Sequence, residues 1–112
     1  MAYQLYITRK KFWHDDGEDI SAEEWVRYIQ NDPELRHMPE FGKYYARWSG
    51  ISKNLDPWLN WFEGRIFSKG PDQPILGKML QIAAALNAKV QGDNEEVYRS
   101  ANPEDCFHPD DA

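Results

Sequence analysis

The amino-acid sequence predicts an α+β domain: a two-layer sandwich of about five mostly antiparallel strands with two helices on one face. Three observations lead to it. Apolar and polar residues alternate in several short segments, two longer segments have helical apolar spacing, and turn-forming residues separate them. Amphipathic helices bury their stripes best against a sheet, and an antiparallel sheet accepts both on one face. The expected order is strand, helix, strand, strand, helix, strand, strand.

Residues 3–8 begin the predicted sheet, because apolar and polar side chains alternate along them. Leu5 and Ile7 fall on one side and Tyr6 falls on the other, which is the period of a half-buried strand. Residues 14–19 are polar and acidic and contain a glycine, so we expect a loop after this strand.

The first helix is predicted to begin after Ser21. Ser21 and Glu24 have the spacing of a capping box, in which each side chain accepts a hydrogen bond from the backbone N–H of the other residue. Trp25 and Ile29 then share one helical face. We expect the helix to end near Pro33, because proline disfavours helical backbone at the residue before it.

Two further strands are predicted at residues 42–48 and 59–67. The second is preceded by Pro57 and Trp58, and Trp58 is expected to cap the edge of the core. A helix is disfavoured here by a glycine and by the density of Trp, Phe and Ile, which suit a pleated surface. One continuous strand through this segment directs Phe62 and Ile66 toward the helices, and the residues that alternate with them away from the helices.

The second helix is predicted to follow a cluster of glycine, proline and aspartate. Asp72 or Gln73 is the expected N-cap, and Pro74 is suited to the first turn. An apolar stripe runs from Ile75 at i, i+4, i+7 and i+11. Asn87 is the expected left-handed residue that ends the helix.

The last predicted strands are residues 89–91 and 97–99, which flank an acidic turn and favour a hairpin. Residues 1–101 therefore form one expected domain. Residues 102–112 contain two prolines and four carboxylates but no Lys or Arg. We expect this tail to be flexible, or held only by Phe107.

The sheet face opposite the helices is the first candidate binding surface. Aromatic and Arg side chains at its predicted outward positions are typical of binding hot spots, although cross-strand pairing alone also explains each of them. A second candidate is an acidic surface formed by the loop 14–19, the turn 92–96 and the tail. The expected partner-contacting residues are Tyr6, Tyr45, Arg47, Trp61, Glu63, Arg65 and Tyr98 on the sheet face, and Asp15, Asp16 and Glu95 on the acidic surface.

Catalytic patterns are sparse. His14, Asp15 and Asp16 are adjacent, and a His beside carboxylates is suited to metal binding or acid–base chemistry. Neighbouring residues in a polar loop rarely converge on one point, however, so a solvated loop is favoured. Cys106 lacks a neighbouring basic residue that would activate its thiol. We therefore expect no enzymatic activity, no cofactor and no metal.

The formal net charge of -6 and the sequence pI of about 5.0 disfavour nucleic acid and anionic membranes, which bind clustered Lys and Arg. An acidic chain is instead attracted to a basic protein. The single cysteine excludes an internal disulfide and fits a reducing compartment. No secretory signal and no apolar run of about 20 residues is visible, so we expect a cytoplasmic location.

Four stretches carry a family resemblance; they read YQLYITRKKFW, ISAEEWVRYIQNDPEL, the Trp-rich segment 57–67, and ILGKMLQIAAALNAKVQGDNEEVY. From about residue 3 to residue 98 the chain resembles small, mostly uncharacterised bacterial cytoplasmic proteins. These are similar to immunity proteins, which are found beside polymorphic or contact-dependent toxins. The resemblance implies a binding scaffold, because none of these stretches is a catalytic signature.

The leading functional hypothesis is therefore a non-enzymatic immunity protein that binds a bacterial toxin and covers its active site or target-binding surface. A homo-oligomerising regulatory or adaptor domain is the alternative, with the sheet face as its self-contact. A small metal-dependent hydrolase that uses His14, Asp15 and Asp16, together with Glu63, is the least favoured hypothesis.

Overall fold

A computed structural model describes residues 3–15, 17, 20–50, 57–69 and 72–111. The strands are β1 (Gln4–Thr8), β2 (Leu35–His37), β3 (Ala46–Trp48), β4 (Trp58–Phe62), β5 (Arg65–Lys69), β6 (Lys89–Gly92), β7 (Val97–Tyr98) and β8 (Cys106–Phe107). The helices are α1 (Ala22–Asn31), α2 (Gln73–Ala85) and a short 3-10 helix, η1 (Pro109–Asp111). Neither α-helix of this described part is long and apolar enough to cross a membrane.

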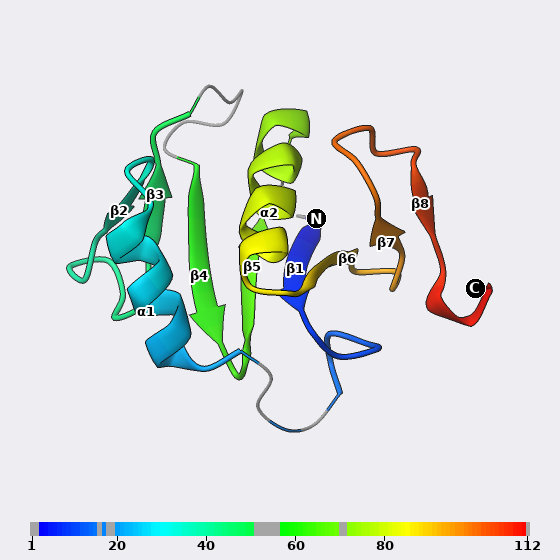
Figure 1. The fold of residues 1–112 in the computed structure, drawn as a ribbon, viewed down its shortest axis with the longest axis horizontal. Helices are drawn as coiled ribbons and strands as arrows, with labels where there is room; N and C mark the ends of the chain where they lie inside the picture. The colour runs from blue at the N-terminus through cyan, green and yellow to red at the C-terminus, as the bar shows by residue number, and fades with distance from the viewer. Residues whose placement is uncertain (1–2, 16, 18–19, 51–56, 70–71, 112) are drawn as a thin grey trace.

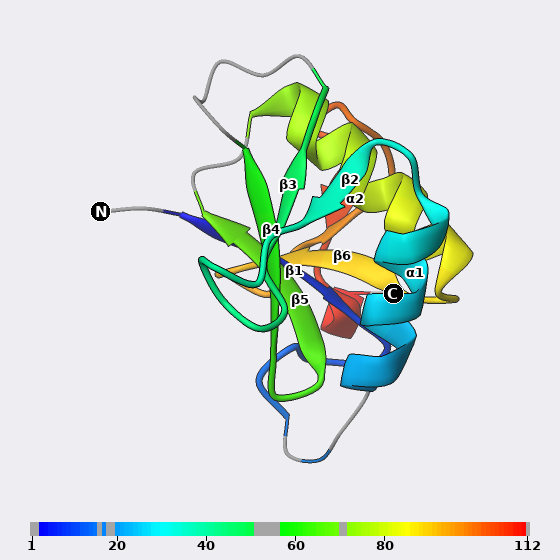
Figure 2. The same ribbon diagram turned by 90° about the vertical axis from the view of Figure 1, so that its left-hand side faces the viewer.

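The strands form one antiparallel sheet in the order β2-β3-β4-β5-β1-β6-β7-β8 (Figure 1). Both α-helices lie on the same face of this sheet (Figure 2). The core fills the space between the two layers. Its fully buried members include Ile7 from β1, Trp25 from α1, Ile66 from β5, Met79 from α2 and Val90 from β6.

The predicted α+β class, with two helices on one sheet face, is confirmed, but the predicted number of five strands is wrong. The described residues contain eight strands. Two of the additional strands, β2 and β8, have three and two residues, which is too short for alternation to be recognised. Another arises because the segment predicted as one strand at 59–67 is a hairpin.

That hairpin joins β4 to β5 through a two-residue turn, Glu63 and Gly64. Their φ angles are 50° and 85°, and positive φ at both central positions defines the tight turn that suits twisted antiparallel strands. Phe62 consequently pairs with Arg65 across the turn. Directly opposed residues share a face, so both side chains lie on the same side of the sheet.

The turn reverses the predicted orientation of the β4 aromatics. Trp61 pairs with Ile66, which is fully buried in the core. The Trp61 indole N–H donates to the Ile20 carbonyl at 2.8 Å, and its ring packs edge-on against Tyr44 at 4.9 Å. Phe62, predicted to face the helices, points away and is 54% exposed. The predictions that Trp61 faces outward and Phe62 faces inward are therefore both wrong.

The predicted capping box of α1 is confirmed. The Glu24 N–H donates to Ser21 Oγ at 3.0 Å, and the Ser21 N–H donates to Glu24 Oε1 at 3.2 Å. Trp25 and Ile29 are buried on the face that packs against the sheet. The helix ends at Asn31, two residues before the proline that was expected to stop it.

The boundaries of α2 also follow the prediction. Asp72 is the N-cap, and its Oδ1 accepts from the Ile75 N–H at 3.2 Å. Asn87, with φ of 56°, adopts the expected left-handed conformation after the helix. The predicted stripe is buried at Ile75 and Met79 and continues into the second half of the helix.

A buried lysine in α2 was not predicted. Lys78 Nζ lies 2.8 Å from Asp32 Oδ2 and 2.7 Å from Glu34 Oε1, so it joins α2 to the segment that follows α1. Burial opposes ionisation of Asp32, but hydrogen bonds from Lys78, from Tyr28 and from the backbone outweigh it. The pKa of Asp32 is consequently lowered. A buried lysine is tolerated here because both of its contacts are carboxylates.

The C-terminal hairpin and the tail complete the sheet. β6 and β7 pair around the predicted acidic turn, as expected. Cys106 and Phe107 form β8 and pair with β7, so the sheet extends beyond residue 101 into the predicted tail. The ring centroid of Phe107, the expected anchor of this tail, lies 4.4 Å from the Arg99 guanidinium carbon.

Candidate protein-binding face

The sheet face opposite the helices is the candidate site. The pairing register places Arg47 opposite Trp58, and Tyr6 opposite both Phe67 and Gln91. Side chains alternate between faces along each strand, and the neighbours of these residues contribute to the helix-covered core. These residues therefore share the uncovered side of the sheet.

An aromatic row crosses this face; it consists of Phe41, Tyr45, Trp58 and Phe67. The Phe41 and Tyr45 ring centroids are 5.5 Å apart, and Tyr45 stacks on Trp58 at 5.6 Å. Trp58 in turn meets Phe67 edge-on at 5.6 Å. Each such pair contributes about 0.5–1.5 kcal/mol beyond the burial of its area, so the row holds its own geometry.

The chain itself covers part of the face. Residues 9–15 turn back across the sheet, and Trp13 stacks on Tyr6 with 3.8 Å between centroids and 7° between planes. The fully buried Gln91 holds this segment: its Oε1 accepts from the Trp13 N–H at 2.7 Å, and its Nε2 donates to the Lys11 carbonyl at 3.1 Å. The open part of the face therefore begins beside Trp13.

Arg65 lies at that boundary. Its guanidinium carbon is 5.1 Å from the centroid of Trp13 and 5.8 Å from that of Phe62. We call these three residues the arginine clamp. Cation–π contacts of this kind contribute about 0.5–1 kcal/mol each at exposed sites. In the described part of the chain, Arg65 forms no ion pair with a carboxylate, so the rings orient its charge without neutralising it.

The strand residues of this face carry a charge opposite to that of the whole chain. Every charged strand position on it is basic, although the chain has a net charge of -6. The five positions are Arg36, Arg47, Arg65, Lys69 and Lys89. The acidic residues are concentrated instead on α1, on the loops and in the C-terminal segment.

Some of the predicted site residues come together here. Tyr45, Arg47 and Arg65 lie on the open face as expected. Tyr6 is on the same face but only 5% exposed, because Trp13 covers it. Its hydroxyl donates to Asp93 Oδ1 at 2.9 Å, and burial together with this contact raises its pKa.

Other predicted residues lie elsewhere. Trp61 and Tyr98 are on the helix side of the sheet, and the Tyr98 hydroxyl donates to Glu96 Oε2 at 2.8 Å. Glu63 is exposed in the hairpin turn, beside the face and outside the strands. The predicted outward positions of Trp61 and Tyr98 are therefore wrong, because strand pairing puts them in line with core residues.

Part of the predicted acidic surface is engaged in contacts within the chain. Glu95 Oε2 lies 2.6 Å from His14 Nε2, and Glu95 Oε1 lies 3.3 Å from His108 Nε2. The hydrogen bond with His14 is the main cause of the lowered pKa of Glu95. Asp15 is exposed and accepts from the Phe12 N–H at 3.3 Å. Asp16 lies outside the described residues, as do residues 18–19 of the predicted loop.

In the described residues, His14 and Asp15 form separate contacts. His14 contacts Glu95, which is distant in the sequence, whereas Asp15 accepts from the backbone of Phe12. No group of three or more His, Cys, Asp or Glu side chains in these residues has an arrangement that could hold a metal ion.

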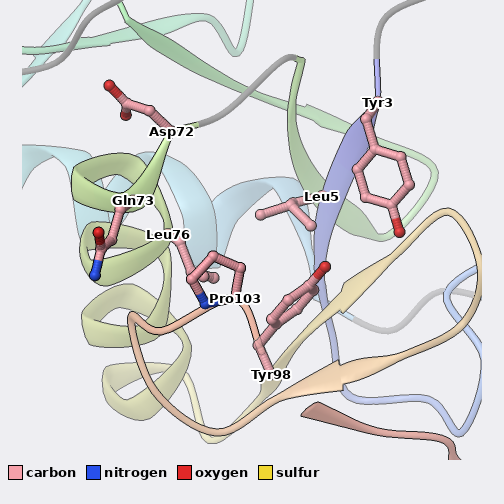
Figure 3. A pocket seen from close by; sticks show the side chains of 7 residues that line it. All are labelled: Tyr3, Leu5, Asp72, Gln73, Leu76, Tyr98 and Pro103. Carbon is pink, nitrogen blue, oxygen red and sulfur yellow. The ribbon is translucent and has the colours of Figure 1, made fainter. Parts of the chain in front are cut away.

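A cavity of about 400 Å³ lies on the helix side, between the start of α2 and the end of the sheet (Figure 3). Leu5, Leu76 and Pro103 supply apolar walls beside the rings of Tyr3 and Tyr98. Both tyrosine hydroxyls bind Glu96. Burial and that carboxylate raise the pKa of Tyr3 to about 12, so these hydroxyls stay protonated. The cavity therefore combines apolar walls with tyrosine hydroxyls that are bound to Glu96, and Asp72 and Gln73 also line it.

Several residues of the open face were missed from the sequence. They are Phe41, Phe62, Phe67, Trp13 and Trp58. Trp58 was expected to cap the edge of the core, but it stacks on Tyr45 on the open face. The signal for the β4 and β5 residues was present: a Glu-Gly pair between two apolar runs fits a two-residue hairpin turn. Nothing local indicates that residues 9–15 fold across the sheet.

Comparison with known proteins gives no match: no family model, no curated protein and no solved structure is similar to the chain. The geometry of the open face therefore carries the functional argument.

Proposed function

We propose that this chain is a non-enzymatic protein-binding domain and that its partner docks on the aromatic row and the arginine clamp. The observation that carries the proposal is the exposure of Phe41 and Phe62, at 61% and 54%, on a face where arginines contact the same rings. Large apolar side chains gathered on one uncovered face mark an interaction surface more often than a structural need. Aromatic residues and arginine also supply most hot-spot energy in protein interfaces.

The face is organised before binding. Tyr45 and Trp58 hold each other by stacking, and Trp13 is fixed by Tyr6 and by the Gln91 side chain. Rings that are already positioned lose little conformational entropy when a partner covers them, which favours tight binding. Slow release is the kinetic property that an inhibitor of a toxic partner requires.

Within this class, we propose an immunity protein that neutralises a bacterial toxin by occluding it. This role follows the expectation drawn from the sequence, and an inhibitor that acts by coverage needs a rigid face but no active site. The aromatic row would pack against apolar side chains of the toxin, and the arginine clamp would fix the orientation. The product of a toxin gene adjacent to the chain's own gene is the natural candidate partner.

Co-expression tests the proposal. Proteins encoded beside the gene are expressed with the chain, and both growth of the host and co-purification are measured. We expect one of them to be toxic alone, to be tolerated with the wild-type chain, and to lose that protection with Phe62→Ala. Gln30→Ala, at an exposed position on α1, is the matched control and should protect fully. The proposal is refuted if the wild-type chain neither binds any of these proteins nor protects the host from them.

Self-association through the same face is less favoured. A two-fold dimer places the same patch on both copies, so the basic residues of one copy would lie against those of the other. Like charges brought together in an interface cost several kcal/mol. Sedimentation of the isolated protein should therefore show a monomer, whereas a concentration-dependent dimer lost on Trp58→Ala would favour the adaptor hypothesis.

A further inference from the structure

The charge of the open face restricts the chemistry of its partner. Arg36 and Lys69 are exposed, and like Arg65 they form no ion pair in the described part of the chain. Basic positions run from β2, at one edge of the sheet, across β3 and β5. A surface with this pattern repels basic surfaces and attracts acidic ones, whatever the net charge of the whole chain.

The arginine clamp adds geometry to this charge. Trp13 and Phe62 contact the guanidinium carbon of Arg65, and Trp13 is itself held by Tyr6 and Gln91. A guanidinium group is planar and binds a carboxylate through two parallel hydrogen bonds. An arginine held between rings loses less rotamer freedom when it forms such a pair than a mobile surface arginine does.

We infer that the partner presents an acidic segment to this face, with a carboxylate bound by Arg65 and apolar side chains packed on Tyr45 and Trp58. This inference rests on the proposed function and specifies the partner's contacting surface. It differs from the basic partner that the net charge of -6 favours. The basic face and the acidic remainder of the molecule together would orient the domain on a partner whose own charge is uneven.

A single-stranded nucleic acid is also anionic, but the aromatic geometry favours protein. Bases bind such proteins by stacking on exposed ring faces. Here Tyr45 and Trp58 stack on each other at 22°, and Tyr6 and Trp13 stack at 7°, so one face of each of these rings is already covered by a neighbouring ring.

Three probes of equal length test the inference: a peptide alternating glutamate and leucine, the same peptide with lysine in place of glutamate, and an oligothymidylate. Binding is followed by the fluorescence of the tryptophans, because Trp13 and Trp58 lie on the face. We expect the glutamate peptide alone to bind, with an affinity that falls as salt is added. Stronger binding of the lysine peptide or of the oligonucleotide would overturn the inference.

Variants locate the contact. Arg65→Gln should weaken binding of the glutamate peptide about tenfold, since hydrogen bonds to charged groups are stronger than those between neutral groups. Arg65→Lys should retain part of the affinity, because it keeps the charge but loses the planar fork. Arg27→Gln, at an exposed position on α1, is the matched control and should change affinity less than twofold. Circular dichroism verifies that each variant is folded. An unchanged affinity for Arg65→Gln would contradict the inference.

The two proposals can fail separately. If Phe62→Ala abolishes protection against the adjacent toxin while Arg65→Gln does not weaken its binding, the binding face stands and the acidic segment is refuted. If no adjacent protein is bound but the glutamate peptide binds through Arg65, the immunity role is refuted and the preference for acidic segments stands.

Discussion

The two faces of the sheet use the same residue types for different purposes. On the helix side, the indole N–H groups of Trp25 and Trp61 donate to backbone carbonyls at 2.8 Å, and the rings pack into or against the core. On the opposite side, Trp58 stacks on Tyr45 and meets Phe67 edge-on, and Arg47 lies over Phe41, the outer ring of the same row. The indoles of Trp25 and Trp61 are therefore satisfied by the backbone, whereas Trp58 on the open face remains partly exposed.

Trp58 and Trp61 give the sharpest test of this difference, since both belong to β4. Trp61→Ala should destabilise the protein by about 4 kcal/mol, because it leaves a cavity beside the helices. Trp58→Ala should cost about 1 kcal/mol, the value of its ring pairs. Urea denaturation measures both. Equal losses would show that the two faces are not energetically distinct.

Lys78 tests the polar part of the helix side. Lys78→Met keeps the length of the side chain but leaves the Asp32 carboxylate without its buried counter-charge. We expect a loss of about 3 kcal/mol at neutral pH, measured by urea denaturation. The loss should shrink as the pH falls below about 3.9, the unfolded pKa of aspartate, because the lowered pKa of Asp32 stabilises the fold only above that range. Gln81→Met, an exposed position on the same helix, is the control.

Gln91 connects the segment 9–15 to the sheet. Gln91→Leu leaves the Trp13 N–H and the Lys11 carbonyl without their bonds, so we expect a loss of about 2 kcal/mol. Amide hydrogen exchange should increase in residues 9–15 more than in α2. Uniform exchange in both regions would show that this segment is not a separately opening cover of the face.

Substitution of Glu24 should change the stability least. Glu24 accepts hydrogen bonds from Arg9 and so links the segment 9–15 to α1. The hydrogen bond from Arg9, followed by that from the Ser21 N–H, lowers the pKa of Glu24 to about 2. Because the pKa of Glu24 is lower in the folded protein, ionised Glu24 stabilises the fold at pH values above its unfolded pKa of about 4.3. This stabilisation is lost as the pH falls toward 2. Glu24→Gln should therefore be less stable than the wild type near neutral pH and equally stable near pH 2. A difference that does not depend on pH would contradict the assignment.

The parts of the fold with local signals were predictable. Ser21 and Glu24 mark one helix start, Asp72 marks the other, and Asn87 marks an end, because each acts through backbone groups within a few residues. The acidic turn between β6 and β7 belongs to the same class. Such signals need no knowledge of the tertiary structure.

The candidate face was less predictable because it depends on register and on distant contacts. A single unrecognised turn at Glu63 and Gly64 exchanged the assigned sides of Trp61 and Phe62. The packing of Trp13 on Tyr6 depends on Gln91, which is far away in sequence. The prediction was correct for Tyr45 and Arg47, because alternation alone determines their side of the sheet. It was also correct for Arg65, because the two-residue turn leaves the residues after it on the side that uninterrupted alternation predicts.

The turn at Glu63 and Gly64 also determines how the protein can diverge. Substitutions at Phe62 change one exposed side chain, so the recognition surface can vary at little cost to folding. A single inserted or deleted residue in the turn would instead require another turn type or a slip in the pairing, and a one-residue slip moves every β4 or β5 side chain to the other face. Relatives that recognise different partners should therefore differ freely in the composition of this hairpin while keeping its length unchanged.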